Sequence, residues 1–477
     1  MFKMLIAKNS KNDELIKSQF IQVVRDKDKA IIWHSLFGNP KIVSKETLEL
    51  LDIFSNLRQL NFVFGEYNCD ENNEKAIQDL IENYYLVPKD FDERELLSKR
   101  MKEREKTIID GSLINYLELI MSEACNFKCS YCIHFNNLEM TNRIKNQKKF
   151  MNFETAKEMV DNYLSILRRH KKNVAEVNFG GGEPLIAWPV VKRVLEYCQL
   201  KHSKEFDFRF SINTNASLIT PKIAEKLKEY HVEIASSLDG LSDGNDRVRL
   251  TKSGAGTFEI IMQGFENLAE QDYPMDGIAV TINDKNFPFI DERIIDWASG
   301  RKMREVRIDI DIIGIVQTPI EDIVTKLMRI RRYAKDCGIE IAGFWSRPAE
   351  NLNDSALDSH VAFCGAVRGN SICLNPSGDI YGCGYSATQI GKLCEIESFH
   401  DPESPYHCFV NEHLTGTMKM CKGCMIEGQC GGGCEITQEF ARMSNTVKIE
   451  RMCDFYRQMT CEILIEQLQE IDTEIAI

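Results

Sequence analysis

Short β-rich segments alternate with amphipathic helical segments between residues 112 and 345. Stretches with helical periodicity, such as NFETAKEMVDNYLSILRRH (152–170), lie between most of the β-rich segments. Strand–helix units in series predict a parallel sheet curled into a partial (β/α)6 TIM-like barrel, which places the chain in the α/β class. Chemistry in such barrels lies at the carboxyl ends of the strands. The six β-rich segments are NYLELIM (115–121), AEVNF (175–179), FRFSINT (208–214), VEIASSL (232–238), DGIAVTI (276–282) and EVRIDID (305–311).

Three cysteines, Cys125, Cys129 and Cys132, follow the first predicted strand in the stretch CNFKCSYC. A disulfide takes two cysteines, and a structural zinc site takes four ligands. Three thiolates in a short loop suit an iron–sulfur cluster, in which three ligands for four irons leave one iron open to a substrate or cofactor. A zinc or disulfide cluster, or chance spacing, remains the alternative from this stretch alone.

Composition indicates a cytoplasmic protein of two or three domains. The 477 residues exceed the size of one ordinary core. The net charge of −13 argues against a general nucleic-acid binder. No apolar run approaches the roughly 20 residues that span a bilayer, and the N-terminus offers no plausible signal-peptide cleavage site. Because cytoplasmic thiols stay reduced, the 17 cysteines point to metal, and eleven of them lie between Cys364 and Cys461.

The stretch CNFKCSYC resembles the CxxxCxxC loop of the radical S-adenosylmethionine (SAM) enzymes. The resemblance implies that Cys125, Cys129 and Cys132 are catalytic ligands of a [4Fe–4S] cluster. The open iron of that cluster would bind the amino and carboxylate groups of SAM, which supply the missing fourth ligand. One-electron reduction would then cleave SAM to methionine and a 5′-deoxyadenosyl radical.

Later strand ends resemble the SAM-binding segments of the same family. VNFGGGEPLI (177–186) is similar to the GGEP motif, SINTNASLIT (211–220) to the TNG segment, and SSLDG (236–240) with NDRVR (245–249) to the SLDG…R segment. Ala216 stands where glycine is common. Such polar residues at strand ends are also frequent as simple caps. The cofactor-binding residues that the resemblance implies are Tyr131 (beside adenine), Gly181, Gly182, Glu183, Pro184, Ser211, Asn213, Ser237 and Arg249.

The C-terminal cysteines resemble, one for one, the seven-cysteine SPASM extension of radical SAM proteins, which carries two auxiliary [4Fe–4S] clusters. The resemblance implies one cluster on Cys364, Cys383 and Cys434, with Cys373 either a fourth ligand or a plain buried thiol. A zinc ribbon is the alternative for CKGC (421–424) alone. The second cluster would be held by Cys421, Cys424, Cys430 and Cys453, which gives three clusters in all, whereas Cys69, Cys198, Cys337, Cys394, Cys408 and Cys461 have no motif context.

The N-terminal region predicts a small α+β unit. FIQVV (20–24) and KAIIWHSLF (29–37) are expected to be strands, and Ser44 is expected to cap a following helix. The unit resembles the winged-helix recognition domains of peptide-modifying radical SAM enzymes, which bind a leader peptide as an added strand. A structural cap or a dimerisation domain is the alternative. The expected division is 1–95 recognition domain, 96–111 charged linker helix, 112–345 radical SAM core and 346–477 SPASM domain.

The resemblance extends to several kinds of protein modification. Sulfatase maturases have an aspartate directly after the cysteine that corresponds to Cys383, whereas Gly384 and Tyr385 follow it here. We therefore expect a maturase of a ribosomally made (RiPP) precursor peptide that installs a thioether or C–C cross-link, reduced by a donor such as flavodoxin or ferredoxin. Sulfatase-maturase-like oxidation of a protein Cys or Ser, or another SPASM modification such as cofactor maturation, is the alternative. A non-catalytic electron-transfer scaffold and a zinc-binding interaction protein are rivals from other classes.

Overall fold

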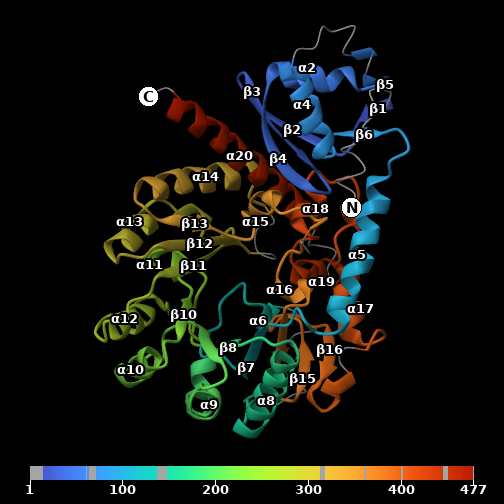
Figure 1. Cartoon of the computed structure of the whole chain (residues 1–477). Helices are drawn as coiled ribbons and strands as arrows, with labels where there is room; N and C mark the ends of the chain where they lie inside the picture. Colours follow the sequence, from blue (N-terminus) through green and yellow to red (C-terminus); the bar gives the residue numbers. More distant parts are fainter. Residues whose placement is uncertain are drawn as a thin grey trace.

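The structure is a computed structural model of the whole chain, shown in Figure 1. The first 13 residues and Cys69 lie outside the residues that it describes. The described residues are 14–60, 62–63, 71–136, 145, 148–311, 317–358, 361–398, 401–443 and 449–475.

The six predicted strands are present and parallel. The first four pair in the order β7-β8-β9-β10, and β11-β12-β13 form a second parallel sheet. A parallel bridge between Ser237 and Ala279 joins the two sheets, so the strands follow one another as in a partial barrel. The strands are β7 (Tyr116–Ser122), β8 (Val174–Gly181), β9 (Asp207–Thr214), β10 (Glu233–Ser236), β11 (Gly277–Ile282), β12 (Glu305–Ile310) and β13 (Glu340–Ala342).

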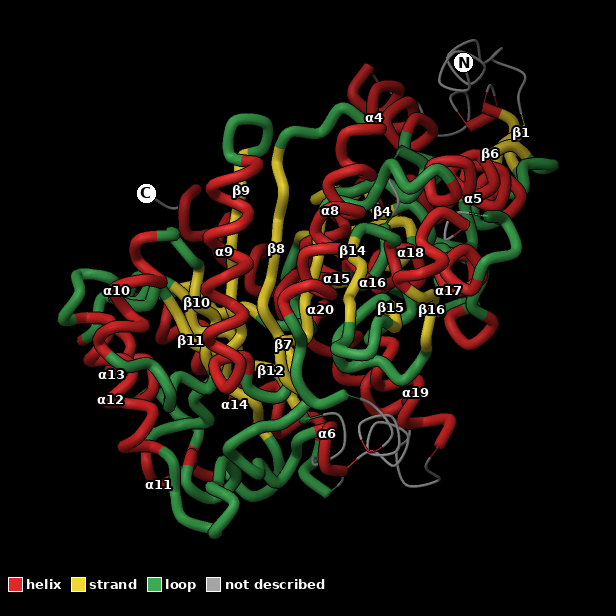
Figure 2. Tube along the Cα trace, turned by 90° about the horizontal axis from the view of Figure 1, so that it is seen from below, coloured by secondary structure: helices red, strands yellow, loops and turns green. Residues whose placement is uncertain are grey.

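Helices cover the outer side of these strands, as Figure 2 shows from below. Their starts follow from local capping: the Asn152 side chain accepts from the Thr155 N–H before α8, and Thr220 accepts from Ile223 before α10. The connecting elements are α6 (Ile133–Asn136), α8 (Phe153–Arg169), η1 (Pro184–Ala187), α9 (Trp188–His202), α10 (Pro221–Glu229), α11 (Ser242–Asn245), α12 (Phe258–Ala269), η2 (Phe287–Phe289), α13 (Arg293–Gly300) and α14 (Ile320–Asp336).

The cysteine-rich C-terminal region continues the barrel sheet. Strand β14 (Ser371–Leu374) pairs in parallel with β7, and β15 (Asp379–Tyr381) and β16 (Gln389–Lys392) extend the sheet in antiparallel fashion. The region therefore shares one hydrophobic core with the barrel. Its helices are α15 (Arg347–Glu350), η3 (Asn351–Asn353), α16 (Gly365–Arg368), η4 (Leu393–Ser398), α17 (Pro405–Glu412), η5 (Lys419–Cys421), α18 (Glu427–Cys430), α19 (Glu435–Met443) and α20 (Ile449–Ile475).

The N-terminal unit contains the two predicted strands, β2 (Ile21–Asp26) and β3 (Lys29–His34), and the Ser44-capped helix α2 (Lys45–Ile53). A third strand, β4 (Gly38–Ser44), was not predicted and forms one edge of this sheet. Side chains of α2 and of α4 (Glu71–Glu82) pack on one face of the sheet and side chains of α20 on the other. A separate small sheet consists of β1 (Glu14–Lys17), β5 (Arg58–Gln59) and β6 (Leu86–Pro88).

The charged linker is the helix α5 (Glu93–Ile109), which starts three residues before the predicted boundary because Asp92 caps it. It descends from the N-terminal unit along α17 (Figure 1). Within the described ranges, none of the helices has the length and apolar character needed to cross a membrane.

Candidate active site

The three cysteines of the stretch CNFKCSYC lie in a loop directly after β7, here called the first cluster loop, and all three are partly buried. The Phe127 N–H donates to the Cys125 sulfur at 3.4 Å, and the Cys132 N–H donates to the Cys129 carbonyl at 3.2 Å. The loop backbone also bonds to residues 248–250, through Lys128 N to Leu250 O at 2.7 Å and Ser130 N to Val248 O at 2.8 Å. The chain after β10 therefore fixes the position of the cysteine loop.

The donor set of this loop fits an iron–sulfur cluster. Burial raises the pKa of Cys125 to about 11 and that of Cys132 to about 12, and the neighbouring cysteines of the loop add to both shifts. Metal binding requires thiolates, so iron would supply the positive charge that these crowded sulfurs lack.

No three His, Cys, Asp or Glu side chains in the described part of the chain converge on a single metal ion. In a cubane cluster each cysteine binds its own iron, so its sulfurs enclose a larger volume than the ligands of one ion.

The glycine run at the end of β8 packs directly against the cysteine loop. A Cβ at Gly181 would lie 2.3 Å from the Ser122 carbonyl oxygen, and one at Gly182 would lie 2.7 Å from that of Ala124. The Gly182 N–H donates to Ser122 O at 2.7 Å. Gly181 also has a φ of +120°, which favours glycine. The resemblance implies that Gly181 and Gly182 bind SAM, which stays a prediction, and their missing side chains also make room for the loop backbone.

Glu183, in the GGEP motif, holds the loop that follows β9. Its carboxylate is completely buried and accepts from Leu185 N at 3.0 Å, Thr214 Oγ1 at 2.7 Å and Asn215 N at 2.8 Å. Burial raises the pKa of this carboxyl, and the three donors oppose the shift. The group thus ties the GGEP loop to the end of β9, and Pro184 begins the short η1 helix after it.

Asn215 links that strand end to the first cluster loop and was missed by the sequence reasoning. Its Nδ2 lies 3.7 Å from the Cys125 sulfur and donates to Asn126 Oδ1 at 2.9 Å. Ala216, which stands where glycine is common in the family, has a φ of +61°, in the region that favours glycine. The TNAS stretch itself was the available signal for Asn215.

Tyr131 and Arg249 meet at a third residue that was not predicted, Asp239 of the SSLDG stretch. The Tyr131 hydroxyl donates to Asp239 Oδ2 at 2.5 Å, and Arg249 Nη1 donates to the Tyr131 hydroxyl at 2.6 Å. Burial raises the pKa of Asp239, and the Arg249 cation opposes this shift. Arg249 Nε is buried without a hydrogen-bond partner among the described residues.

Three polar side chains on neighbouring strands, Glu118 on β7, Asn178 on β8 and Ser211 on β9, form a row across the sheet. Ser211 Oγ donates to Asn178 Oδ1 at 2.9 Å, and Asn178 Nδ2 lies 3.5 Å from Glu118 Oε1. Glu118 also accepts from the Gly384 N–H at 3.1 Å. Glu118 was missed, although a single charge within the apolar stretch NYLELIM was a usable signal. The remaining predicted residues, Asn213 and Ser237, lie at the carboxyl ends of β9 and β10.

Cys364, Cys383 and Cys434, here called the first auxiliary set, come from three separate segments that the fold brings together. Burial raises the pKa of Cys383, and Cys364 and Cys434 add to that shift. Burial likewise raises the pKa of Cys434 to about 12, with Cys364 contributing. Cys373 lies on β14, fully buried with Ile120 and Tyr381, and its role as a ligand stays a prediction.

Cys421, Cys424, Cys430 and Cys453, here called the second auxiliary set, are also brought together. Burial raises the pKa of Cys421 to about 12, with contributions from Cys453 and Cys424. The same cysteines contribute to the raised pKa of Cys430. Cysteines of each set thus lie close enough to raise one another's pKa, and their roles as cluster ligands stay a prediction.

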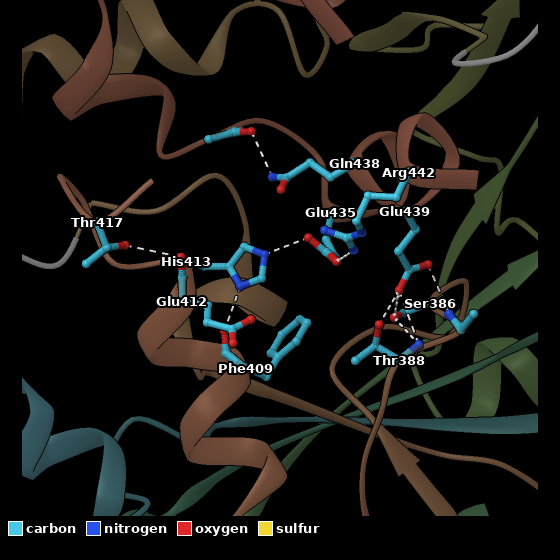
Figure 3. Close-up of polar contacts among 12 residues, drawn as sticks. Ser386, Thr388, Phe409, Glu412, His413, Thr417, Glu435, Gln438, Glu439 and Arg442 are labelled. Atoms are coloured by element: carbon cyan, nitrogen blue, oxygen red, sulfur yellow. Dashed lines mark hydrogen bonds and ion pairs between the residues drawn. The ribbon is translucent and has the colours of Figure 1, made fainter. Parts of the chain in front are cut away.

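Helix α19 anchors the loop after Cys383 (Figure 3). The buried Glu439 carboxylate accepts from Ser386 Oγ at 2.6 Å, Ala387 N at 3.0 Å and Thr388 Oγ1 at 2.7 Å. His413 of the segment after α17 bonds Glu435 at 2.6 Å, directly beside Cys434. These contacts hold two segments of the first auxiliary set in place.

The N-terminal unit is bonded to the loop of the second auxiliary set. Trp33 Nε1 donates to the Met425 carbonyl at 2.8 Å, and Gly428 N donates to Ser35 O at 2.8 Å. Arg94 of α5 forms a two-pronged ion pair with the buried Glu427, at 2.9 and 3.0 Å. The two regions therefore form one continuous structure.

The fold, the cysteine loop and the strand-end segments together define the class. Residues 119–289 match the family model of the Radical SAM superfamily. The chain therefore contains a radical SAM domain, which implies a [4Fe–4S] cluster and SAM, and this domain is followed by a cysteine-rich extension that resembles SPASM.

The chain is similar over almost its whole length to the radical SAM cyclopropyl synthase TigE of Paramaledivibacter caminithermalis, with 26% identity over 474 residues and 97% of each chain covered. Two solved structures share the fold. Native anSMEcpe with bound AdoMet and Cp18Cys peptide has a TM-score of 0.56 at 17% identity, covering 75% of this chain and 99% of that one. Streptococcus suis SuiB bound to precursor peptide SuiA has a TM-score of 0.50 at 15% identity, covering 91% and 98%.

Proposed function

We propose that this enzyme matures a ribosomally made peptide by removing a hydrogen atom from a peptide carbon and closing a new bond. The similarity to TigE over 97% of both chains, N-terminal unit included, is the observation that carries the proposal. A cyclopropyl ring requires a new carbon–carbon bond, so we favour a C–C linkage over a thioether.

Residues around the first cluster loop have distinct proposed roles. Cys125, Cys129 and Cys132 would hold the cluster that, once reduced, supplies the electron for cleavage of SAM. Glu183 positions the loops instead of touching the ligand. The buried Arg249 Nε–H, without a partner among the described residues, suits the carboxylate of SAM. The other proposed SAM contacts are Tyr131, Gly181, Gly182, Pro184, Ser211, Asn213 and Ser237.

We assign two further [4Fe–4S] clusters to the two auxiliary sets, with Cys373 an optional fourth ligand of the first. An external one-electron carrier such as a flavodoxin or ferredoxin would reduce the enzyme. The closeness of the thiols within each set supports this assignment. The four thiols of the second set would leave no open iron, whereas the three of the first set would leave one.

We further propose that the N-terminal unit binds the leader of the precursor on the outer edge of β4. This strand ends its sheet, so its outer side lacks a strand partner among the described residues. Ile42 on β4 is half exposed. An adjoining groove of about 360 Å³ is lined by Ile31, Pro40, Lys41, Ile42, Asn353, Gln467 and Glu470. An added strand would gain backbone hydrogen bonds there, and the groove would select side chains.

The sulfatase-maturase alternative is supported by the position of Glu118, whose carboxylate lies beside Gly384, where sulfatase maturases have an aspartate. A Cβ at Gly384 would lie 3.0 Å from Glu118 Oε1 and 3.1 Å from Oε2, so a carboxylate occupies the space that an acidic residue at position 384 would fill. Conversion of a Cys or Ser in a sulfatase-derived peptide, without any internal linkage, would identify that function.

The proposal is tested by expressing the enzyme with any short peptide that is encoded beside its gene and measuring the peptide mass. We expect a loss of two hydrogens for each linkage. Cys129→Ala abolishes both this loss and 5′-deoxyadenosine formation, whereas the exposed Cys408→Ala retains both. Normal 5′-deoxyadenosine formation by Cys129→Ala contradicts the assignment.

Leader binding has its own test. Ile42→Glu should prevent modification while SAM cleavage continues, and Ile260→Glu serves as the matched control because Ile260 is 43% exposed on α12. Equal modification by the two variants refutes the β4 site.

A further inference from the structure

An arginine lies against the sulfur of one cysteine of the second auxiliary set. Arg457 Nη1 donates to the Cys424 sulfur at 3.8 Å. Arg457 stands four residues after Cys453 on α20, so both side chains project from the same face of the helix. The guanidinium therefore adjoins two of the four cysteines.

The first cluster loop has a different environment. The Phe127 N–H and the Asn215 amide, both neutral, donate to Cys125, and the Arg249 cation lies close enough to oppose the rise in the pKa of Cys129. Glu427, Asp454 and Glu450 all lie near the second set, and Glu427 is already paired with Arg94. Arg457 is itself paired with Asp454, and its side chain is one-third exposed.

We propose that Arg457 raises the reduction potential of the cluster on the second auxiliary set by holding its guanidinium against Cys424. The inference rests on the cluster assignment in the proposed function. Reduction adds one negative charge to a cluster, so a fixed cation and a hydrogen bond to a ligand sulfur both favour the reduced form. Arg457 is thus a tuning residue, which acts through Cys424 and touches no substrate.

The test uses protein in which Cys125, Cys129 and Cys132 are all alanine, so that only the auxiliary clusters give a signal. Redox titration followed by EPR gives each cluster's midpoint potential, and iron and sulfide analysis gives occupancy. We expect Arg457→Gln to lower the reduced-to-oxidised ratio of one cluster about tenfold at a fixed potential, which is about 59 mV for a one-electron couple. Arg457→Lys should retain most of the wild-type value.

Two further variants make the result decisive. Arg331→Gln removes an arginine of α14 that pairs with Glu466. Glu466 lies on α20, as Arg457 does, but away from the four cysteines, so this variant should shift the potential of neither cluster. Asp454→Asn removes the partner of Arg457 and also a negative charge beside Cys453, so it should raise the same midpoint that Arg457→Gln lowers. If Arg457→Gln loses its cluster, the neutral Arg457→Met is measured in its place and decides the matter.

The outcomes distinguish a failure of the role proposed for Arg457 from a failure of the cluster assignment. Full occupancy with equal potentials in Arg457→Gln, Arg457→Lys and the parent overturns the role of Arg457 alone. Iron and sulfide for only one auxiliary cluster in the parent overturns the cluster assignment itself.

Discussion

The buried Glu183 offers the sharpest test of how the SAM-binding loops are held. Its two oxygens accept three hydrogen bonds, one on Oε2 from Asn215 N and two on Oε1 from Leu185 N and Thr214 Oγ1. In Glu183→Gln one oxygen becomes an NH2 group. If the NH2 group replaces Oε2, it faces the Asn215 N–H, and if it replaces Oε1, it faces the Leu185 N–H. The Thr214 hydroxyl can turn to accept a hydrogen bond, but a backbone N–H cannot.

One buried backbone N–H left without an acceptor costs about 1–3 kcal/mol, and the remaining bonds lose their charge assistance. We expect Glu183→Gln to lower the free energy of unfolding by about 2–3 kcal/mol, and Glu183→Ala by about 3–5 kcal/mol because all three donors lose their acceptor. Glu176→Gln, on the same strand but one-third exposed and 3.9 Å from Arg209, should change it by less than about 0.5 kcal/mol.

The assay is anaerobic urea unfolding of each variant followed by circular dichroism, with SAM affinity measured by calorimetry. We expect the loss of stability to accompany a loss of iron, because Asn215 adjoins Cys125. If Glu183→Gln unfolds like Glu176→Gln while its SAM affinity falls sharply, then Glu183 binds SAM directly and the positioning argument is wrong.

Three other perturbations follow from contacts described above. Arg94→Met leaves the buried Glu427 without its cation and should lower the free energy of unfolding in urea by about 2–4 kcal/mol. Arg100→Met, which breaks an exposed pair on the same helix, should lower it by less than about 1 kcal/mol. Equal losses would show that the ion pair with Glu427 adds no more stability than an exposed one. Burial lowers the pKa of His34 from 6.5 to about 3, so the unfolded chain binds a proton first and stability falls as pH drops below about 6.5, by about 2 kcal/mol at pH 5. His34→Gln should remove that dependence in unfolding measured from pH 7.5 to 5, and an unchanged slope would contradict it. Glu439→Ala should reduce the iron content by about one cluster, because a buried acceptor for four donors disappears; unchanged iron would show that the loop after Cys383 needs no such anchor.

The sequence predicted the six parallel strands because strand and helix periodicity are local patterns. The division of the cysteines into two auxiliary sets came from the resemblance to SPASM proteins and stays a prediction. It could not predict contacts between distant segments. Glu183 was predicted to bind SAM, which stays a prediction, whereas its hydrogen bond from the Asn215 N–H, 32 residues further along the chain, could not be predicted from a local pattern. Arg457 had no motif context, since its significance depends on a contact with a residue 33 positions away. Strand β4 was missed because its stretch, GNPKIVS, contains Gly and Pro, which are uncommon inside strands.

The contact of Trp33 with Met425 has a consequence for engineering. Gly428 is part of the same joint, because a Cβ there would lie 2.0 Å from the Leu36 carbonyl oxygen. A recognition unit transplanted from another enzyme would therefore meet a surface shaped for this one. Chimeras that exchange residues 1–95 alone should assemble poorly, whereas those that carry residues 425–429 along with the new unit preserve the joint. In the proposed function, peptide recognition and the second auxiliary cluster would therefore be inherited together.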